Sequence, residues 1–331
     1  MSTTTYKVSA APASGTRRDL LRGVITGTVA LAAGPWAVRL ARASTAAPLS
    51  EVSLGDGLWL IHGAGANVLV AAGPDGALMV DGGLAANTSA LLSKVAAVTG
   101  TKRVQYLFNT HWRWEHTGSN ETLARAGATL IAHENTKEWL TARIYSKWEN
   151  RLYPPRPAAA LPTKTFYYGA QKLSFAGQDL EYTVMPQSCT DGDIYVLFPK
   201  QNVLVGGGVV SGGGYPIADY CTGGWLGGMI DGLKMLIARC DDNTKVIPAS
   251  GPVRTRKDLQ AQLDMCTAVI GQIGTNYFKG GTWEELQASN PTRTFDAQWG
   301  NPEPFLQVAY DGAWYHVNEI RRYSAPPPVA R

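Results

Sequence analysis

Apolar residues along the chain gather into short runs and amphipathic stretches, separated by turns that contain glycine or proline. Runs of strand length in the first half are followed by stretches with helical periodicity. The predicted elements of this half are strands at 58–61, 67–70, 77–80 and 104–108 and helices at 87–98 and 120–126.

The second half repeats this order. Its predicted elements are strands at 182–185, 194–198, 203–205 and 245–247 and helices at 228–238, 256–273 and 303–322. Because strands come in runs and each run is followed by helices, the sequence predicts an α/β protein with two β-sheets between helical layers.

The N-terminal segment differs in character from the rest. Two arginines, Arg17 and Arg18, precede an apolar stretch from 23 to 37, and the pattern Ala-Arg-Ala ends at Ala43. This arrangement predicts a twin-arginine signal peptide at 1–43, a single domain at 44–331, and a periplasmic or secreted protein. A membrane anchor needs about 20 apolar residues, so no stable anchor is expected once the signal is removed.

Composition is that of a soluble globular protein, with 45% hydrophobic and 17% charged residues among 331. The net charge of +4 belongs to the predicted signal, because 24 basic and 25 acidic residues remain without 1–43. No basic surface therefore argues for a nucleic-acid partner.

The segment from 109 to 120 contains the pattern His-Trp-Arg-Trp-Glu-His, in which His111 and His116 flank Arg113 and Glu115. It resembles the His-x-His-x-Asp-His signature of the metallo-β-lactamase superfamily, with Arg113 at the second histidine and Glu115 at the aspartate. A guanidinium is always protonated and has no lone pair for a metal. The resemblance implies that one metal ligand is lost and that a fixed positive charge replaces it.

Four further segments extend the resemblance, which runs from about residue 58 to about residue 272. The corresponding positions are Asp81 in 78–83, Cys189 in 187–193, Gly208 in 203–208 and Ser250 in 246–252. Asp81 matches the family residue that lies behind the metal, whereas the other three replace ligands. Of seven family ligand positions, only His111 and His116 keep the family residue. The resemblance implies the family's αβ/βα sandwich, with Asp81 and Ser250 supporting the site.

Metal chemistry is altered by these replacements. Gly208 stands where the family has the aspartate that bridges two zinc ions, so a dinuclear zinc centre is not expected. The alternative of a site for a single zinc or copper ion remains open. His111, His116 and Cys189 offer nitrogen and sulfur donors, and Glu115 offers an oxygen.

A metal-free site would use the same side chains differently. Cys189 would act as nucleophile, with His116 or His111 as its base. Arg113 would stabilise a developing oxyanion and lower the pKa of Cys189. The plainer alternative is that Cys189 and Ser250 only fill space left by imidazoles.

The four cysteines, Cys189, Cys221, Cys240 and Cys266, show no CxxC spacing, and their pairing stays open. The resemblance places Cys189 and Cys221 at the mouth of the site. The irregular, proline-rich stretch 139–162 is expected to be an insertion over that mouth.

These features predict an exported hydrolase that acts on a small ester, lactone or related acyl compound through an altered site. One alternative is a pseudoenzyme that binds a ligand or serves as an accessory protein, and another is a mononuclear metal or redox protein. The partner expected in each case is a small molecule, while the oligomeric state stays open.

Overall fold

The computed structural model describes residues 48–324, and the backbone alone from 314 to 324. The predicted signal peptide at 1–43 lies outside the described residues. Among the helices of the described part, none has both the length and the apolar character needed to cross a bilayer.

Seven strands form the first sheet, in the order β1-β2-β3-β4-β5-β6-β9. They are β1 (Ser50–Gly55), β2 (Leu58–His62), β3 (Val68–Gly73), β4 (Gly76–Val80), β5 (Val104–Phe108), β6 (Thr129–His133) and β9 (Lys164–Phe166). Strands β1 to β4 pair antiparallel, and the pairs from β4 through β5 and β6 to β9 are parallel. The carboxyl ends of β4 and β5 therefore meet at one edge of the sheet, where the histidine motif follows β5.

Five strands form the second sheet, in the order β10-β11-β12-β13-β14. They are β10 (Ala170–Phe175), β11 (Gln178–Val184), β12 (Ile194–Phe198), β13 (Val203–Gly207) and β14 (Lys245–Pro248). Only β13 and β14 pair in parallel. A separate hairpin of β7 (Ile144–Ser146) and β8 (Arg151–Tyr153) lies within the predicted insertion at 139–162.

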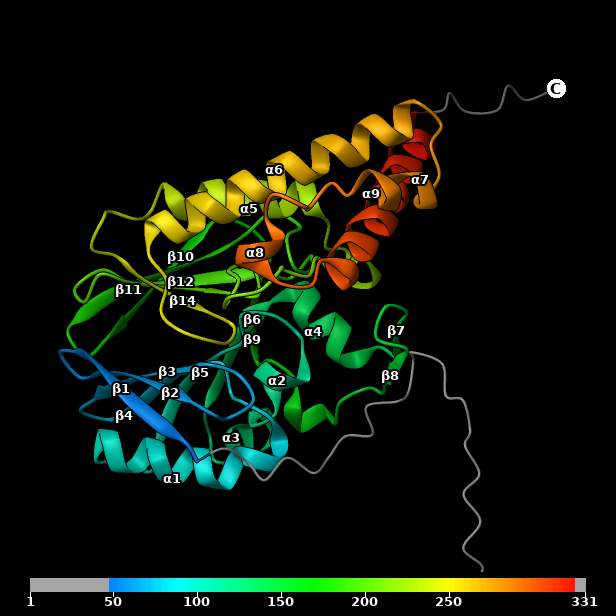
Figure 1. Cartoon of the computed structure of the whole chain (residues 1–331). Helices are drawn as coiled ribbons and strands as arrows, with labels where there is room; N and C mark the ends of the chain where they lie inside the picture. Colours follow the sequence, from blue (N-terminus) through cyan, green and yellow to red (C-terminus); the bar gives the residue numbers. More distant parts are fainter. Residues whose placement is uncertain (1–47, 325–331) are drawn as a thin grey trace, which may run out of the picture. The chain divides into compact units, whose positions relative to one another are not determined.

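Helices cover the outer face of each sheet, and the inner faces pack on one another (Figure 1). The helices are α1 (Thr88–Thr99), α2 (Trp114–Thr117), α3 (Asn120–Arg125), α4 (Glu134–Thr141), α5 (Leu226–Ile237), α6 (Arg256–Phe278), α7 (Trp283–Ser289), α8 (Asp296–Trp299) and α9 (Glu303–Ser324). Leu91 and Val95 of α1 pack on the first sheet, and α5, α6 and α9 pack on the second. The predicted αβ/βα sandwich is confirmed.

The core between the sheets is built from side chains that alternate along their strands. Leu78 and Phe108 of the first sheet join Tyr182, Val196 and Ile247 of the second in one buried cluster. Phe108 and Tyr182 meet edge to face, with ring centroids 4.9 Å apart. Burial of this apolar surface fixes the two sheets against each other.

Asn67 links the two sheets beside the site. Its amide nitrogen donates to the carbonyls of Pro248 and Gly251, at 2.9 Å each, and its backbone nitrogen donates to Ala249 at 2.8 Å. The amide oxygen accepts from His62 Nδ1 at 2.8 Å. One buried side chain thus joins the start of β3 to the loop after β14.

We expect Asn67→Ala to lower the free energy of unfolding by about 1–3 kcal/mol, because two carbonyls lose their donor in a largely buried setting. The matched control Asn243→Ala removes an exposed amide that bonds no described residue, and we expect it to stay within about 0.5 kcal/mol. Urea denaturation measures both values. Equal stability of the two variants would contradict the linking role of Asn67.

Candidate functional site

Asp81 follows β4 directly and adopts a left-handed backbone conformation, with φ of 65°. Non-glycine residues rarely occupy this region, and doing so costs about 1–3 kcal/mol unless surrounding contacts compensate. The backbone nitrogen of Asp81 donates to Phe108 of β5 at 2.8 Å. This turn directs a buried carboxylate toward the residues that follow β5.

The carboxylate of Asp81 accepts hydrogen bonds from both Thr110 and His116. Its Oδ1 accepts from the backbone nitrogen of Thr110 at 2.8 Å, and its Oδ2 accepts from the Thr110 hydroxyl at 2.8 Å. The same Oδ2 lies 2.8 Å from His116 Nδ1. A buried carboxylate with this many donors holds its partners in one arrangement.

These bonds determine which ring nitrogens carry protons. A carboxylate can only accept, so His116 Nδ1 donates to Asp81, and the single hydroxyl proton of Thr110 also goes to Asp81. The Thr110 oxygen, 2.9 Å from His111 Nδ1, must then accept from that nitrogen. Both histidines therefore carry a proton on Nδ1, and both keep a lone pair on Nε2.

The two imidazole rings lie side by side, with centroids 4.2 Å apart and planes tilted by 44°. Burial first, then the neighbouring His116 and Arg113, hold the pKa of His111 well below its usual value. His111 is thus neutral at neutral pH. Among the described side chains, neither Nε2 atom has a hydrogen-bond partner.

Cys189 and His111 both lie next to Gly208. A Cβ built on Gly208 would approach Cys189 Sγ to 2.7 Å and His111 Cε1 to 3.3 Å. No side chain fits there while Cys189 stays in place, so an aspartate at position 208 would displace the thiol. Glycine at 208 and cysteine at 189 are a matched pair.

Arg113 lowers the pKa of Cys189 as expected, but the net shift of this pKa is upward. Burial first, then the Asp193 carboxylate, raise the pKa of this thiol well above its usual value, and Arg113 only partly opposes them. The structure encloses the sulfur and surrounds it with acidic groups. All four cysteines are free thiols.

Arg113 is not free to replace a metal charge. Its guanidinium donates to Asp219 at 2.9 Å and to Glu149 at 3.1 Å, and its side chain is only 13% exposed. Burial alone would lower the pKa of Arg113, but Asp219, Cys189 and Glu149 raise it overall. Within the described residues, Arg113 forms no ion pair with Glu115.

Two indoles complete the surroundings of Arg113. The guanidinium carbon lies 5.4 Å from the ring of Trp112 and 5.0 Å from that of Trp148. Trp148 also donates to the fully buried Asp219 at 3.2 Å. The residues between β7 and β8 are thereby fixed over Arg113, which agrees with the predicted insertion over the site.

Among the described residues, neither Glu115 nor Ser250 forms a hydrogen bond or ion pair with His111 or His116. Glu115 is the neighbour of His116 in a short helix, where adjacent residues point in different directions. Its side chain is 31% exposed and lies 3.8 Å from Arg151. Ser250 is exposed, and its hydroxyl bonds no described residue.

Three further residues were missed by the sequence analysis. Thr110 lies within the motif and connects His111 to Asp81. Asp219 and Glu149 neutralise Arg113 from 106 and 36 positions away, a pairing that no local pattern signals.

Few side chains near the two histidines could act as metal ligands. Within the described residues, no three histidine, cysteine or acidic side chains form a group that could hold a metal ion. His111 and His116 offer two nitrogens, and the closed thiol of Cys189 does not complete the set. These side chains fall one ligand short of the three that a zinc site takes from the protein.

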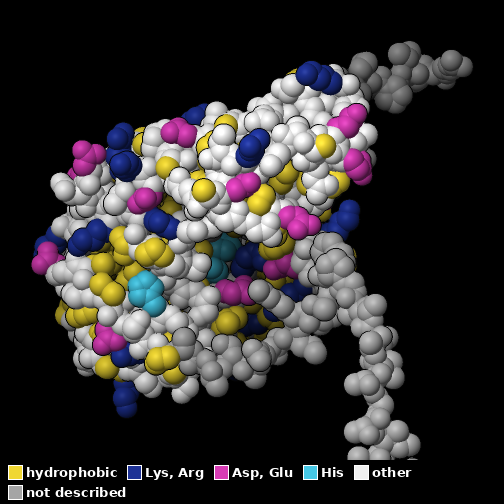
Figure 2. Space-filling model, in the orientation of Figure 1, with side chains coloured by type: hydrophobic (Ala, Val, Ile, Leu, Met, Phe, Trp, Pro, Cys, Tyr) yellow, Lys and Arg dark blue, Asp and Glu magenta, His cyan; other side chains and the backbone are white. Residues whose placement is uncertain are grey.

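The face of the molecule between the two sheets is hollowed, as Figure 2 shows. Histidine, basic and acidic side chains gather inside this hollow.

Comparisons with known proteins agree with the architecture. A family model, the metallo-beta-lactamase superfamily, matches residues 63–237, and none of the curated proteins matches the chain. A metallo-beta-lactamase from Pontibacter korlensis is 20% identical, with a TM-score of 0.52, over 66% of this chain and 99% of that one. One from Hirschia baltica is 19% identical, with a TM-score of 0.52, over 66% and 98%. The DIM-1 metallo-beta-lactamase is 18% identical, with a TM-score of 0.53, over 67% and 98%. At these identities the likeness shows the fold.

We expect iodoacetamide to label Cys189 more slowly than the partly exposed Cys221 and Cys240 in the folded protein. Each unit of raised pKa lowers the thiolate fraction about tenfold, and burial hinders access as well. Peptide mass spectrometry after timed labelling at pH 7.5 measures the rates, and the urea-unfolded protein serves as control. Preferential labelling of Cys189 in the folded state would contradict the enclosed, high-pKa thiol.

Proposed function

The chain belongs to the metallo-β-lactamase superfamily, and we propose that it is an exported hydrolase of a small ester, lactone or related acyl compound. The observation that supports this most is the Asp81 carboxylate, which orients His116 directly and His111 through Thr110. In this proposal an imidazole does the work that metal-bound hydroxide would otherwise do.

His116 is the proposed general base. Its Nδ1 donates to Asp81, which stabilises the positive charge that forms when Nε2 takes up a proton. The neighbouring His111 is held neutral by the shift of its pKa, so it does not repel a proton on His116. A base with a fixed tautomer and a charged partner is the arrangement that general-base catalysis needs.

The proposed reaction uses water as nucleophile. His116 Nε2 removes a proton from water while the water oxygen attacks the carbonyl carbon, and a tetrahedral intermediate forms. The carbon–oxygen bond to the leaving alcohol then breaks, and His116 returns the proton to that alcohol oxygen. An ester yields an acid and an alcohol, and a lactone yields one hydroxy acid.

Cys189 and Arg113 have supporting roles in this proposal. The thiol is enclosed and its pKa is raised, which disfavours a nucleophilic thiolate. Arg113 is already paired with Asp219 and Glu149. Its guanidinium lies over the ring of Trp148, and in this proposal that indole contacts an apolar acyl group.

The proposal includes two statements about the mature protein. It is released into the periplasm or secreted after cleavage at the segment ending in Ala43. It binds at most one equivalent of zinc or copper, because the two neighbouring histidines are the only favourable donors in the described part of the site.

The test is hydrolysis of p-nitrophenyl acetate and of a series of simple lactones by the parent protein and by His116→Gln. Loss of a general base lowers kcat by roughly 10²–10⁴-fold. We expect His116→Gln to show this loss and Asp81→Asn to show a smaller one. His62→Gln is the matched control, because it removes a histidine that contacts Asn67 rather than Asp81.

The assay is done on protein as purified and after dialysis against a chelator, with zinc and copper measured in each sample. Activity that survives chelation and requires His116 supports the proposal. Activity that is lost on chelation and restored by zinc contradicts the metal-free base. No turnover of any of these substrates contradicts the hydrolase and favours the binding-protein alternative.

A further inference from the structure

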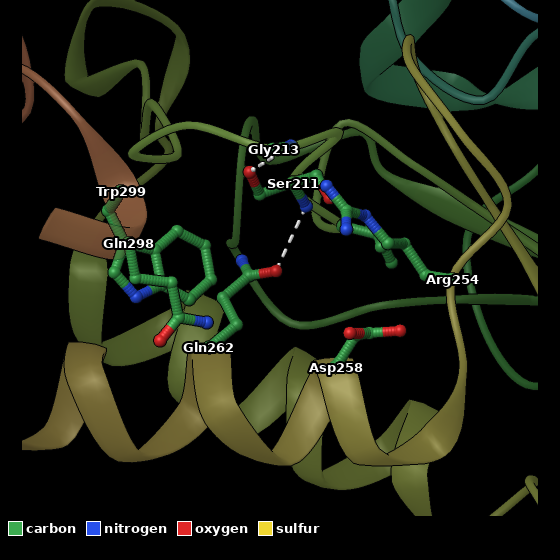
Figure 3. A pocket seen from close by; sticks show the side chains of 8 residues that line it. Ser211, Gly213, Arg254, Asp258, Gln262, Gln298 and Trp299 are labelled. Atoms are coloured by element: carbon green, nitrogen blue, oxygen red, sulfur yellow. Dashed lines mark hydrogen bonds between the residues drawn. The ribbon is translucent and has the colours of Figure 1, made fainter.

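A second cavity, of about 140 Å³, lies on the outer side of the loop that follows Gly208 (Figure 3). Its lining comes from that loop, the segment before α6, the first turns of α6, and α8. The lining residues are Val210, Ser211, Gly213, Arg254, Asp258, Gln262, Gln298 and Trp299. Pockets for drug-sized ligands measure roughly 300–1,000 Å³, so this cavity fits only a small molecule.

The loop is held in place from below by Gln262, which is buried. Its amide oxygen accepts from the backbone nitrogen of Ser211 at 2.9 Å, and its amide nitrogen donates to the carbonyl of Val209 at 2.9 Å. Figure 3 shows Gln262 reaching from α6 toward Ser211. The loop uses both hydrogen-bonding groups of the Gln262 side chain. Gln262 therefore shapes the cavity, and a ligand has to bind to the other residues that line it.

Arg254 contributes unused donors. Its Nε donates to the carbonyl of Ser211 at 3.2 Å, and no hydrogen bond or ion pair joins its terminal nitrogens to any described residue. A Cβ on Gly213 would lie 2.8 Å from Arg254 Nη2, and Gly213 has a φ of 137°, so glycine lets the guanidinium approach the loop. A guanidinium with two open nitrogens favours a carboxylate.

Asp258 contributes an unused acceptor of opposite charge. Its Oδ2 accepts from the backbone nitrogen of Thr255 at 2.8 Å and from the Thr255 hydroxyl at 2.7 Å, while no described group bonds its Oδ1. Asp258 and Arg254 form no ion pair with each other, although both line the cavity. A partly enclosed charge is stabilised by a partner of opposite sign, and each of these two lacks one there.

We propose that this cavity binds a small zwitterion, a free amino acid, whose carboxylate pairs with Arg254 and whose ammonium pairs with Asp258. The ligand then satisfies both charges at once, whereas an acetate or a simple amine would leave one charge unpaired and meet a like charge. The primary amide of Gln298 adds a donor and an acceptor at the opening, and Trp299 supplies an apolar wall. This site is separate from the histidine pair and does not depend on the proposed hydrolase activity.

Isothermal calorimetry with glycine and L-alanine tests the proposal, with acetate, methylammonium and L-lactate as comparisons. We expect both amino acids to bind with millimolar affinity, lactate to bind at least about tenfold more weakly, and acetate and methylammonium more weakly still. The melting temperature should rise with amino-acid concentration, because a ligand of the folded state stabilises it.

Two variants remove one charge each. Arg254→Gln and Asp258→Asn should each weaken L-alanine binding at least about tenfold. The matched controls are Arg256→Gln and Asp264→Asn, which remove the same charges from α6 without lining the cavity, and they should bind as the parent does.

The melting temperature of each variant without ligand shows whether that variant is folded. If Arg254→Gln does not fold, the binding of L-alanine to Asp258→Asn decides whether the site is charged as proposed. If acetate binds as tightly as L-alanine, the proposal of a zwitterionic ligand is overturned, because Asp258 then has no role in binding. Absence of amino-acid binding to the parent at tens of millimolar would overturn the site itself.

Discussion

The hydrogen bonds to the buried Asp81 carboxylate are the interaction on which the site depends. They join the end of β4 to Thr110 after β5 and to His116 in α2. Removing such an acceptor would leave several buried donors without partners, at a cost of about 1–3 kcal/mol for each. The left-handed backbone of Asp81 is tolerated because these contacts compensate for it. One residue therefore sets both the local fold and the protonation of two imidazoles.

Around this centre, charge is balanced within the protein. The buried Asp219 and its neighbour Glu149 neutralise the Arg113 guanidinium. Gly208 has no side chain, and this makes room for Cys189. Since the cation is paired and the thiol has a raised pKa, the imidazole nitrogens are the groups left for chemistry.

Strong apolar patterns allowed several buried strands to be predicted from the sequence. The strands at 104–108 and 194–198 have the predicted bounds. Strand β6 was missed although most of it is buried, and the edge strands β1 and β10 were missed because their exposed and polar residues weaken the apolar pattern. Asp81, His111, His116 and Cys189 could be named from their segments. The partners of Arg113 could not be predicted in this way. Asp219 is 106 residues away in the sequence and approaches Arg113 only in the folded protein.

The role of Asp81 is tested most directly by the tautomers of the two rings, measured by ¹⁵N NMR of histidine-labelled protein at pH 7.5. We expect His111 and His116 both to carry the proton on Nδ1 and a lone pair on Nε2. We also expect His111 to stay neutral as the pH falls through about 6.5, the usual histidine pKa. A proton on Nε2 of His116, or a His111 that titrates at the ordinary pKa, would contradict the central role of Asp81.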